Sequence, residues 1–222
     1  IKIYQLKKLN NIQNKMNRNL KSESFTIPDL KITANVELKD IYSRAANVVG
    51  KIISRNHKYR DEFIIIGAHF DHLGYGGPGS GSLKPDTNAV HNGANDNASG
   101  TAGLLELAHK LQANRKLLKR SILFIAFDAE EKGLLGSKYF VQNPTINIKN
   151  VSAMINMDMI GKMRDSTVII GGVGTSPVFE PILDSLSIDS GLKFEYDKAG
   201  YGPSDHASFY SENIPVLFFF TG

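Results

Sequence analysis

Residues 61–71 read DEFIIIGAHFD, in which an apolar run leads directly into His69 and Asp71. An unbroken apolar run is typical of a strand buried on both faces at the centre of a parallel sheet. Residues 121–127 (SILFIAF) and 151–156 (VSAMIN) are similar runs, and each is followed by carboxylates. We therefore expect a central sheet whose strand ends carry polar chemistry.

Amphipathic segments separate these apolar runs. Residues 99–114 place Leu104, Leu107, Ala108 and Leu111 at helical spacing, and residues 133–142 and 177–190 are also expected to be helices. Further strands are expected at residues 47–53, 167–171 and 215–220, and residues 74–95, rich in Gly, Pro, Ser and Asn, read as a long loop. The alternation predicts an α/β fold with a central, mostly parallel mixed sheet covered by helices on both faces.

The first part of the chain differs from the rest in charge. Residues 1–60 hold 13 Lys+Arg and 4 Asp+Glu, whereas residues 61–222 hold 13 and 18. Residues 1–21 are expected to form a helix and residues 24–38 a strand. We therefore predict a basic N-terminal segment, residues 1–45, followed by a domain spanning residues 46–222.

Composition excludes several classes of protein. There is no cysteine, which excludes disulfides and thiolate metal sites and leaves His and carboxylates as metal ligands. No run of 18 apolar residues is present, so no membrane span is expected. The basic residues are not interleaved with aromatics as a nucleic-acid surface requires, so no nucleic-acid partner is expected.

Imidazole and carboxylate groups follow four different segments of the predicted fold. Each one has an ordinary alternative interpretation: a helix cap for Asp96, solvated surface for the Glu130–Glu131 pair, an ion pair with lysine for Asp158. Together they would place several like charges at one edge of the sheet without nearby cations, which requires a bound cation. The residues concerned are His69, Asp71, Asp96, Glu130, Glu131 and Asp158.

Histidine and carboxylate ligands suit zinc, and two zinc ions can share a bridging carboxylate. Adjacent side chains of an extended segment point in different directions, so one of Glu130 and Glu131 can bind metal while the other acts as general base. Asp71 lies two residues after His69 and can orient the imidazole without binding the metal itself.

Five stretches together resemble the M28 family of zinc peptidases, in family order, over residues 47–222. They are GAHFDHLG (67–74), NGANDNASG (92–100), FDAEEKGLLGS (127–137), NMDMIG (156–161) and YGPSDHASF (201–209). The resemblance implies a zinc exopeptidase-like fold, two Zn²⁺ ions per chain in the intact enzyme and a peptide substrate with a free N-terminus.

The resemblance also implies individual roles. His69 and Asp158 would bind one zinc, Glu131 would bind the other, and Asp96 would bridge both. Glu130 would be the general base acting on the water between the metals. Tyr201 resembles a family tyrosine that stabilises the oxyanion, with packing at the rim as its alternative.

In the family, the histidine of the second zinc comes after the last strand, so we expect it beyond Gly222. Asp205 and His206 are therefore expected to surround the substrate pocket, with ligation by His206 as the alternative. His72 is interpreted as a loop side chain away from the metal, and His91 as solvated.

The expected function is metal-dependent peptide hydrolysis by an aminopeptidase. Two alternatives remain, a glutaminyl cyclase-like acyltransferase and a non-catalytic M28-like binding domain. The resemblance suggests that residues 1–45 are the remnant of an inserted protease-associated domain. A secreted or periplasmic bacterial location, with which the absence of cysteine is compatible, is also expected. The oligomeric state, the exopeptidase direction and the preferred first residue stay open, because the family also contains carboxypeptidases and dipeptidases.

Overall fold

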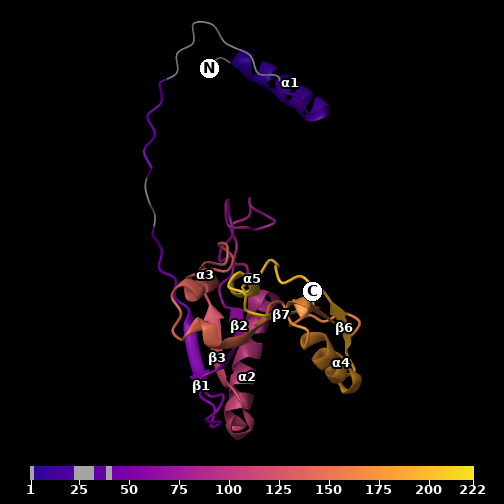
Figure 1. Cartoon of the computed structure of the whole chain (residues 1–222). Helices are drawn as coiled ribbons and strands as arrows, with labels where there is room; N and C mark the ends of the chain where they lie inside the picture. Colours follow the sequence, from indigo (N-terminus) through magenta and orange to yellow (C-terminus); the bar gives the residue numbers. More distant parts are fainter. Residues whose placement is uncertain (1–2, 23–32, 39–41) are drawn as a thin grey trace. The chain divides into compact units, whose positions relative to one another are not determined.

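The computed structural model describes residues 3–22, 33–38 and 42–222, which fall into two units, Ile1–Tyr42 and Ser43–Gly222. The first unit contains helix α1 (Ile3–Asn19), close to the helix expected from the sequence (Figure 1). Of the strand expected at 24–38, residues 24–32 lie outside the described residues, and residues 33–38 form no strand.

The second unit is built on a seven-stranded sheet in the order β1-β3-β2-β4-β7-β5-β6. Strand β2 lies between β3 and β4 and is parallel to both, and β4 is parallel to β7. Two antiparallel pairs, β1 with β3 and β5 with β7, make the sheet mixed. The predicted mixed, mostly parallel sheet is confirmed.

The apolar runs of the sequence form the central strands with little change of boundary. The strands are β1 (Val48–Ile52), β2 (Phe63–His69), β3 (Ser121–Phe127), β4 (Val151–Met157), β5 (Thr167–Gly171), β6 (Lys193–Tyr196) and β7 (Val216–Phe220). The α-helices are α2 (Gly100–Ala113), α3 (Leu135–Gln142), α4 (Phe179–Ser190) and α5 (His206–Tyr210). Short helical segments are η1 (Ala94–Ser99), η2 (Arg115–Leu117), η3 (Ile148–Asn150) and η4 (Val173–Thr175).

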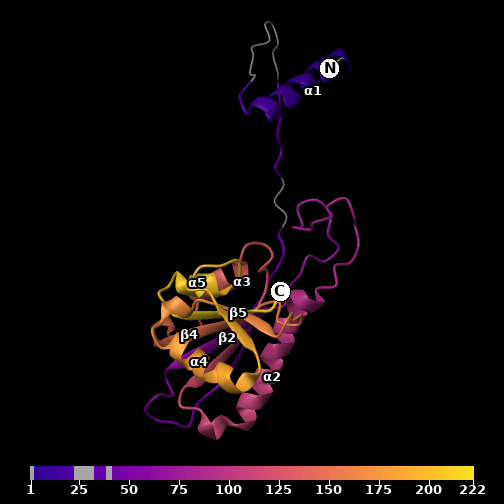
Figure 2. The ribbon, with the colours of Figure 1, turned by 90° about the vertical axis from the view of Figure 1, so that its right-hand side faces the viewer.

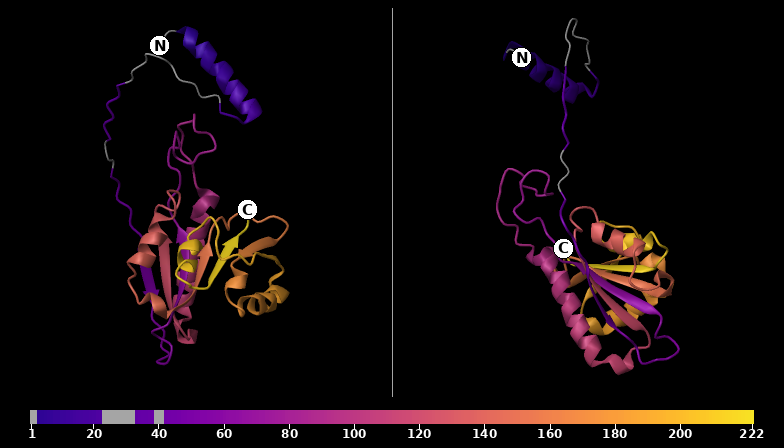
Figure 3. Two further views of the ribbon diagram at one scale, coloured as in Figure 1. Left: turned by 45° about the horizontal axis from the view of Figure 1, so that its top comes forward. Right: turned by 90° about the vertical axis from the view of Figure 1, so that its left-hand side faces the viewer.

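Helices cover both faces of the sheet, as expected. On one face, Phe140 of α3 and Phe209 of α5 pack against alternate residues of the central strands, among them Ile65 and Met154. On the other face, α2 packs through Leu104 and α4 through Leu183. Figure 2 shows α3 and α5 on one side and α2 and α4 on the other, and Figure 3 shows α2 lying along the twisted sheet.

One strand and one α-helix of the second unit were not expected. Strand β6 is short and half exposed, so it carries none of the continuous apolar character that marks the central strands. Helix α5 has five residues and begins at His206, inside a stretch interpreted as a pocket motif. Both are too short for a periodic pattern to show.

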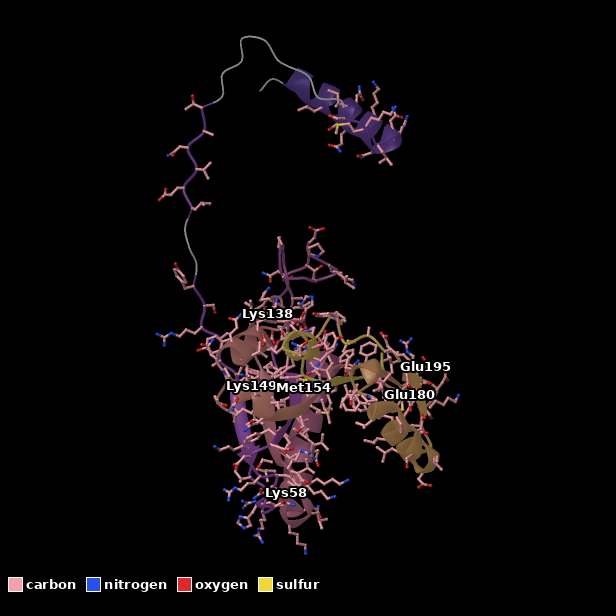
Figure 4. The ribbon with its side chains drawn as sticks, viewed as in Figure 1. Lys58, Lys138, Lys149, Met154, Glu180 and Glu195 are labelled. Atoms are coloured by element: carbon pink, nitrogen blue, oxygen red, sulfur yellow. The ribbon has the colours of Figure 1, made fainter. Side chains whose placement is uncertain are left out.

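The parallel strands β2, β3 and β4 end at the same edge of the sheet, which is where their carboxyl ends meet. Lys58, in the segment before β2, marks the opposite end, and Met154 lies among the central strands (Figure 4). Within the part of the chain that the structure describes, no helix has the length and apolar character needed to cross a membrane.

Candidate metal centre

The edge of the sheet where β2, β3 and β4 end collects the imidazole and carboxylate groups. His69 is the last residue of β2 and pairs in register with Phe127 at the end of β3. Glu130 and Glu131 follow β3 in a tight turn, and Asp158 follows β4 directly. Three neighbouring parallel strands therefore deliver their side chains to one place.

Asp96 joins them from the segment before α2, and Asn97 holds that segment in position. The buried Asn97 donates a hydrogen bond to the Met157 carbonyl at 3.0 Å and accepts one from the Met159 N–H at 3.2 Å. At Gly100, an added Cβ would lie only 2.5 Å from the Met157 carbonyl oxygen, so only glycine fits here. The start of α2 thus lies close against the end of β4, which brings Asp96 near Asp158.

His69 lies at the centre of this cluster and is almost fully buried. Its Nε2 lies 3.3 Å from Asp96 Oδ1, 3.4 Å from Asp158 Oδ1 and 3.9 Å from Glu130 Oε2. Burial disfavours the charged imidazole, but the nearby carboxylates of Asp158, Asp71 and Asp96 outweigh burial and hold the pKa of His69 far above its usual value. The surroundings of Nε2 therefore strongly favour positive charge.

Among the residues that the structure describes, none forms a hydrogen bond with the Asp158 oxygen that faces His69. Asp158 Oδ2 accepts a hydrogen bond from Ser204 Oγ at 2.8 Å, which fixes the carboxylate, whereas the buried Oδ1 has none. Two ligands bound to one tetrahedral zinc at about 2.0–2.1 Å are about 3.3 Å apart. The separations of His69 Nε2 from Asp96 and Asp158 match that value, so these residues fit a zinc ion.

A second group lies beside the first and shares Asp96 as its link. His72, Asp96 and Glu131 each offer an atom, and these atoms all lie within 4.8 Å of one another. His72 Nδ1 is 2.7 Å from Glu131 Oε1 and 3.8 Å from Asp96 Oδ2. From the sequence, His72 is interpreted as a loop side chain away from the metal, whereas the folded loop turns its imidazole toward Glu131.

Asp71 fixes the turn that carries the two glutamates. Its carboxylate accepts hydrogen bonds from the backbone N–H groups of Glu130 at 3.0 Å and Glu131 at 3.2 Å. The His69 Nδ1 atom lies 3.1 Å from the Asp71 carbonyl oxygen and 3.6 Å from its carboxylate. The Asp71 backbone therefore makes the closer contact with the imidazole, and its side chain orients the glutamates.

Glu130 is buried among like charges. Burial raises the pKa of Glu130 to about 8, with Asp205, Asp158 and Glu131 adding to the effect and His69 opposing it. In the described part of the chain, the ion pairs of Asp96, Glu130, Glu131 and Asp158 are with His69 and His72, and none is with lysine or arginine. This concentration of carboxylates suits a bound cation.

A cavity of about 300 Å³ opens onto these groups. One side is acidic and the other is apolar; its lining residues are Asp96, Glu130, Glu131, Asp158, Met159, Pro203, Phe218 and Phe220. A small organic molecule with one charged and one apolar end fits such a lining.

The other predicted site residues lie around this cavity at greater depth or at the surface. Asp205 and His206 are fully buried and are absent from its lining; the His206 ring stacks on Phe218 at 4.4 Å between centroids, so it lies behind the wall. Tyr201 is 64% exposed and packs edge-on against Tyr210. None of these three side chains belongs to the group of close contacts around His69.

The comparisons with known proteins agree on one family. Residues 47–222 match the model of peptidase family M28. The chain is similar to leupeptin-inactivating enzyme 1 of Streptomyces exfoliatus, with 34% identity over 59% of this chain and 29% of that protein. An aminopeptidase of Pseudomonas aeruginosa is 29% identical over 88% of this chain and 34% of its own length.

Solved structures give the same result. A zinc aminopeptidase from Bacillus subtilis superposes with a TM-score of 0.61 at 27% identity, covering 79% of this chain and 40% of that one. An aminopeptidase from Aneurinibacillus has a TM-score of 0.60 at 31% identity, covering 79% and 39%. The chain thus spans about a third of the length of the curated relatives named here.

Proposed function

Because the chain belongs to peptidase family M28, we propose that it forms the catalytic part of a zinc-dependent aminopeptidase acting on peptides with a free N-terminus. The observation that carries this proposal is the placement of His69 Nε2 3.3–3.4 Å from carboxylate oxygens of Asp96 and Asp158. The names of the relatives, which include zinc aminopeptidases, support both the metal and the substrate.

The metal centre would hold two ions. His69 and Asp158 would bind the first and Glu131 the second, with Asp96 between them, since its Oδ1 faces His69 and its Oδ2 faces the second group. When bound, zinc polarises a carbonyl group and makes hydroxide available near neutral pH.

Glu130 is the general base of the proposed reaction. It lines the cavity, is buried, and its surroundings raise its affinity for a proton. Its carboxylate takes a proton from the attacking water and returns it to the leaving amine. Asp71 holds the Glu130 backbone, so the carboxylate stays aimed at the cavity.

The remaining carboxylates and the apolar wall would position the substrate. The acidic side of the cavity attracts the free α-amino group of a peptide, which is positively charged near neutral pH. Met159, Phe218 and Phe220 provide an apolar surface beside it. Tyr201 as an oxyanion donor, residues 1–45 as the remnant of an inserted domain, and a secreted or periplasmic location stay predictions.

The test combines metal analysis with a pair of substrates. We expect the purified protein to bind zinc and to hydrolyse leucine p-nitroanilide but not its N-acetylated form, and to lose this activity on chelation. His69→Ala should lose both metal and activity. Zinc-dependent conversion of an N-terminal glutaminyl peptide into a pyroglutamyl peptide, with loss of ammonia and no cleavage of a peptide bond, would favour a cyclase instead. A protein that binds no zinc would overturn the proposal.

A further inference from the structure

His72 lies in a group of polar side chains, although the family resemblance assigns no role to this histidine. Its Nδ1 atom is 2.7 Å from Glu131 Oε1 and 3.8 Å from Asp96 Oδ2. The side chain is 22% exposed, against 17% for Glu131 and 35% for Asp96, so all three face a partly enclosed space. The Nδ1 atom of the His72 imidazole is therefore directed at the two carboxylates.

Asp96 lies between two imidazoles. Its Oδ1 is 3.3 Å from His69 Nε2, and its Oδ2 is 3.8 Å from His72 Nδ1. A carboxylate that presents one oxygen to each of two imidazole groups has the arrangement needed to bridge two cations. One cation would lie beside His69, and the other would lie beside His72.

The backbone around His72 leaves room for the ring in this orientation. Gly93 has a positive φ of 63°, and a Cβ there would lie 3.0 Å from both Cβ and Cδ2 of His72. A larger residue at position 93 would therefore displace the ring. The absence of a side chain at Gly93 lets His72 turn its Nδ1 atom toward Glu131.

We propose that His72 is a ligand of the second divalent metal ion, supplying Nδ1 to an ion that Asp96 and Glu131 also bind. This inference rests on the proposed metal centre and adds an imidazole to it from the loop after β2. An imidazole with two carboxylates is a donor set for zinc or cobalt(II), in contrast to the oxygen-only sets that calcium and magnesium prefer.

The present separation of His72 Nδ1 and Glu131 Oε1 is that of a hydrogen bond. Two ligands of one tetrahedral zinc are about 3.3 Å apart, so binding requires the two side chains to separate by about half an ångström. The alternative role for His72 is to orient Glu131 through this hydrogen bond without touching metal. The experiment must distinguish a ligand from an orienting group.

Cobalt(II) titration of the metal-free protein makes this distinction, because ligand-field bands report the donors around each ion. We expect the wild-type protein to bind two ions. His72→Ala should keep the first ion and weaken the second by at least about 10–100-fold, the loss that removal of an orienting partner alone produces. In His72→Gly, added imidazole should restore the affinity and the bands of the second ion, since free imidazole can replace a ligand.

His91→Ala is the matched control. His91 is a loop histidine whose ring lies 6.4 Å from that of His72, and its nitrogens contact Ser82 Oγ and the Ala89 carbonyl. It should bind both ions as the wild type does. A zinc-soaked crystal should place an ion about 2.0–2.1 Å from His72 Nδ1.

The outcomes separate this inference from the proposed function. Two ions bound with equal affinity by wild type and His72→Ala would overturn the assignment of His72 alone. A wild-type protein that binds one ion would also overturn it while leaving the His69 site intact. The same holds if added imidazole restores the affinity of His72→Gly without imidazole bands at the second ion. A wild-type protein that binds no ion would overturn both.

Discussion

The carboxylate of Asp71 accepts a hydrogen bond from the backbone N–H of Glu130 at 3.0 Å. This contact joins the loop after β2 to the turn after β3, and a second one to Glu131 at 3.2 Å reinforces it. Burial opposes the negative charge of Asp71, but the contact with His69 and these two hydrogen bonds outweigh burial and lower its pKa. Asp71 is thus an ionised positioning residue for both glutamates.

Replacing Asp71 should therefore loosen the turn without removing a metal ligand. We expect Asp71→Ala to lower zinc affinity by about 10–100-fold, the usual effect of removing a group that orients a ligand. Asp71→Asn keeps one carbonyl acceptor and should lose less. Zinc titration with a competing chelator measures the effect.

Asp128→Asn provides the control for this experiment. Asp128 lies in the same turn, but its carboxylate accepts hydrogen bonds from the Ala46 and Ala129 N–H groups, away from the glutamates. Its zinc affinity should stay near the wild-type value. If Asp71→Ala and Asp128→Asn behave alike, the orienting role of Asp71 is refuted.

Glu130→Gln should separate proton transfer from metal binding. Glutamine keeps the size of the side chain but cannot accept the proton, so we expect kcat to fall by about 10²–10⁴-fold. Zinc content should stay near that of the wild type, because Glu130 is the base and not one of the proposed ligands. Steady-state kinetics together with metal analysis of the same preparation provide both measurements, and near-normal turnover would place the base elsewhere.

The central part of the fold could be predicted because burial leaves a strong signal in sequence. Strands β2 and β3 are apolar almost throughout, since neighbours cover both of their edges and helices cover both faces. Strand β6 lies at the edge of the sheet with alternate residues exposed, so its four residues carry no such signal. Helix α5 is buried by tertiary packing and not by an amphipathic repeat.

The candidate site shows the same limit. Strand ends bring His69, Glu130 and Asp158 together, and that convergence follows from parallel topology. The direction of a loop side chain does not follow from topology, because it depends on backbone conformation and on neighbours distant in sequence. His72 reaches Glu131, 59 residues further along the chain, only through the folded loop. Tyr201 and His206 were predicted from motif position, which carries no information on depth.

Substitution of Phe209 tests the hydrophobic packing of the core that supports the site. It is fully buried, and its ring packs against Phe127 and Phe140 with centroids 5.9 and 6.0 Å away. Phe209→Ala should lower the free energy of unfolding by about 3–5 kcal/mol through the lost burial and the cavity left behind. Tyr139→Ala, at a side chain that is 64% exposed, should change it by less than about 0.5 kcal/mol. Equal losses in urea denaturation would contradict the packing described here.

Asp205 should give the metal-free protein a pH-dependent stability. It is fully buried, and neither carboxylate oxygen has a hydrogen-bond partner within the described residues. Burial raises its pKa to about 7, Asp158 and Asp71 add to this, and Ser137 and His69 oppose it. Between about pH 4 and pH 7 the folded chain therefore keeps a proton on Asp205 that the unfolded chain releases.

Because the folded state binds more protons in that window, its stability falls as the pH rises, by at most about 1.4 kcal/mol per pH unit from this group. Asp205→Asn cannot ionise, so its stability relative to the wild type should increase from pH 4 to pH 7 and level off above. Urea denaturation at several pH values without metal measures this difference. Asp86→Asn, at an exposed side chain, serves as the control. A flat difference for Asp205→Asn would mean that Asp205 is ionised in the folded protein across this range, with a partner for its charge inside the core.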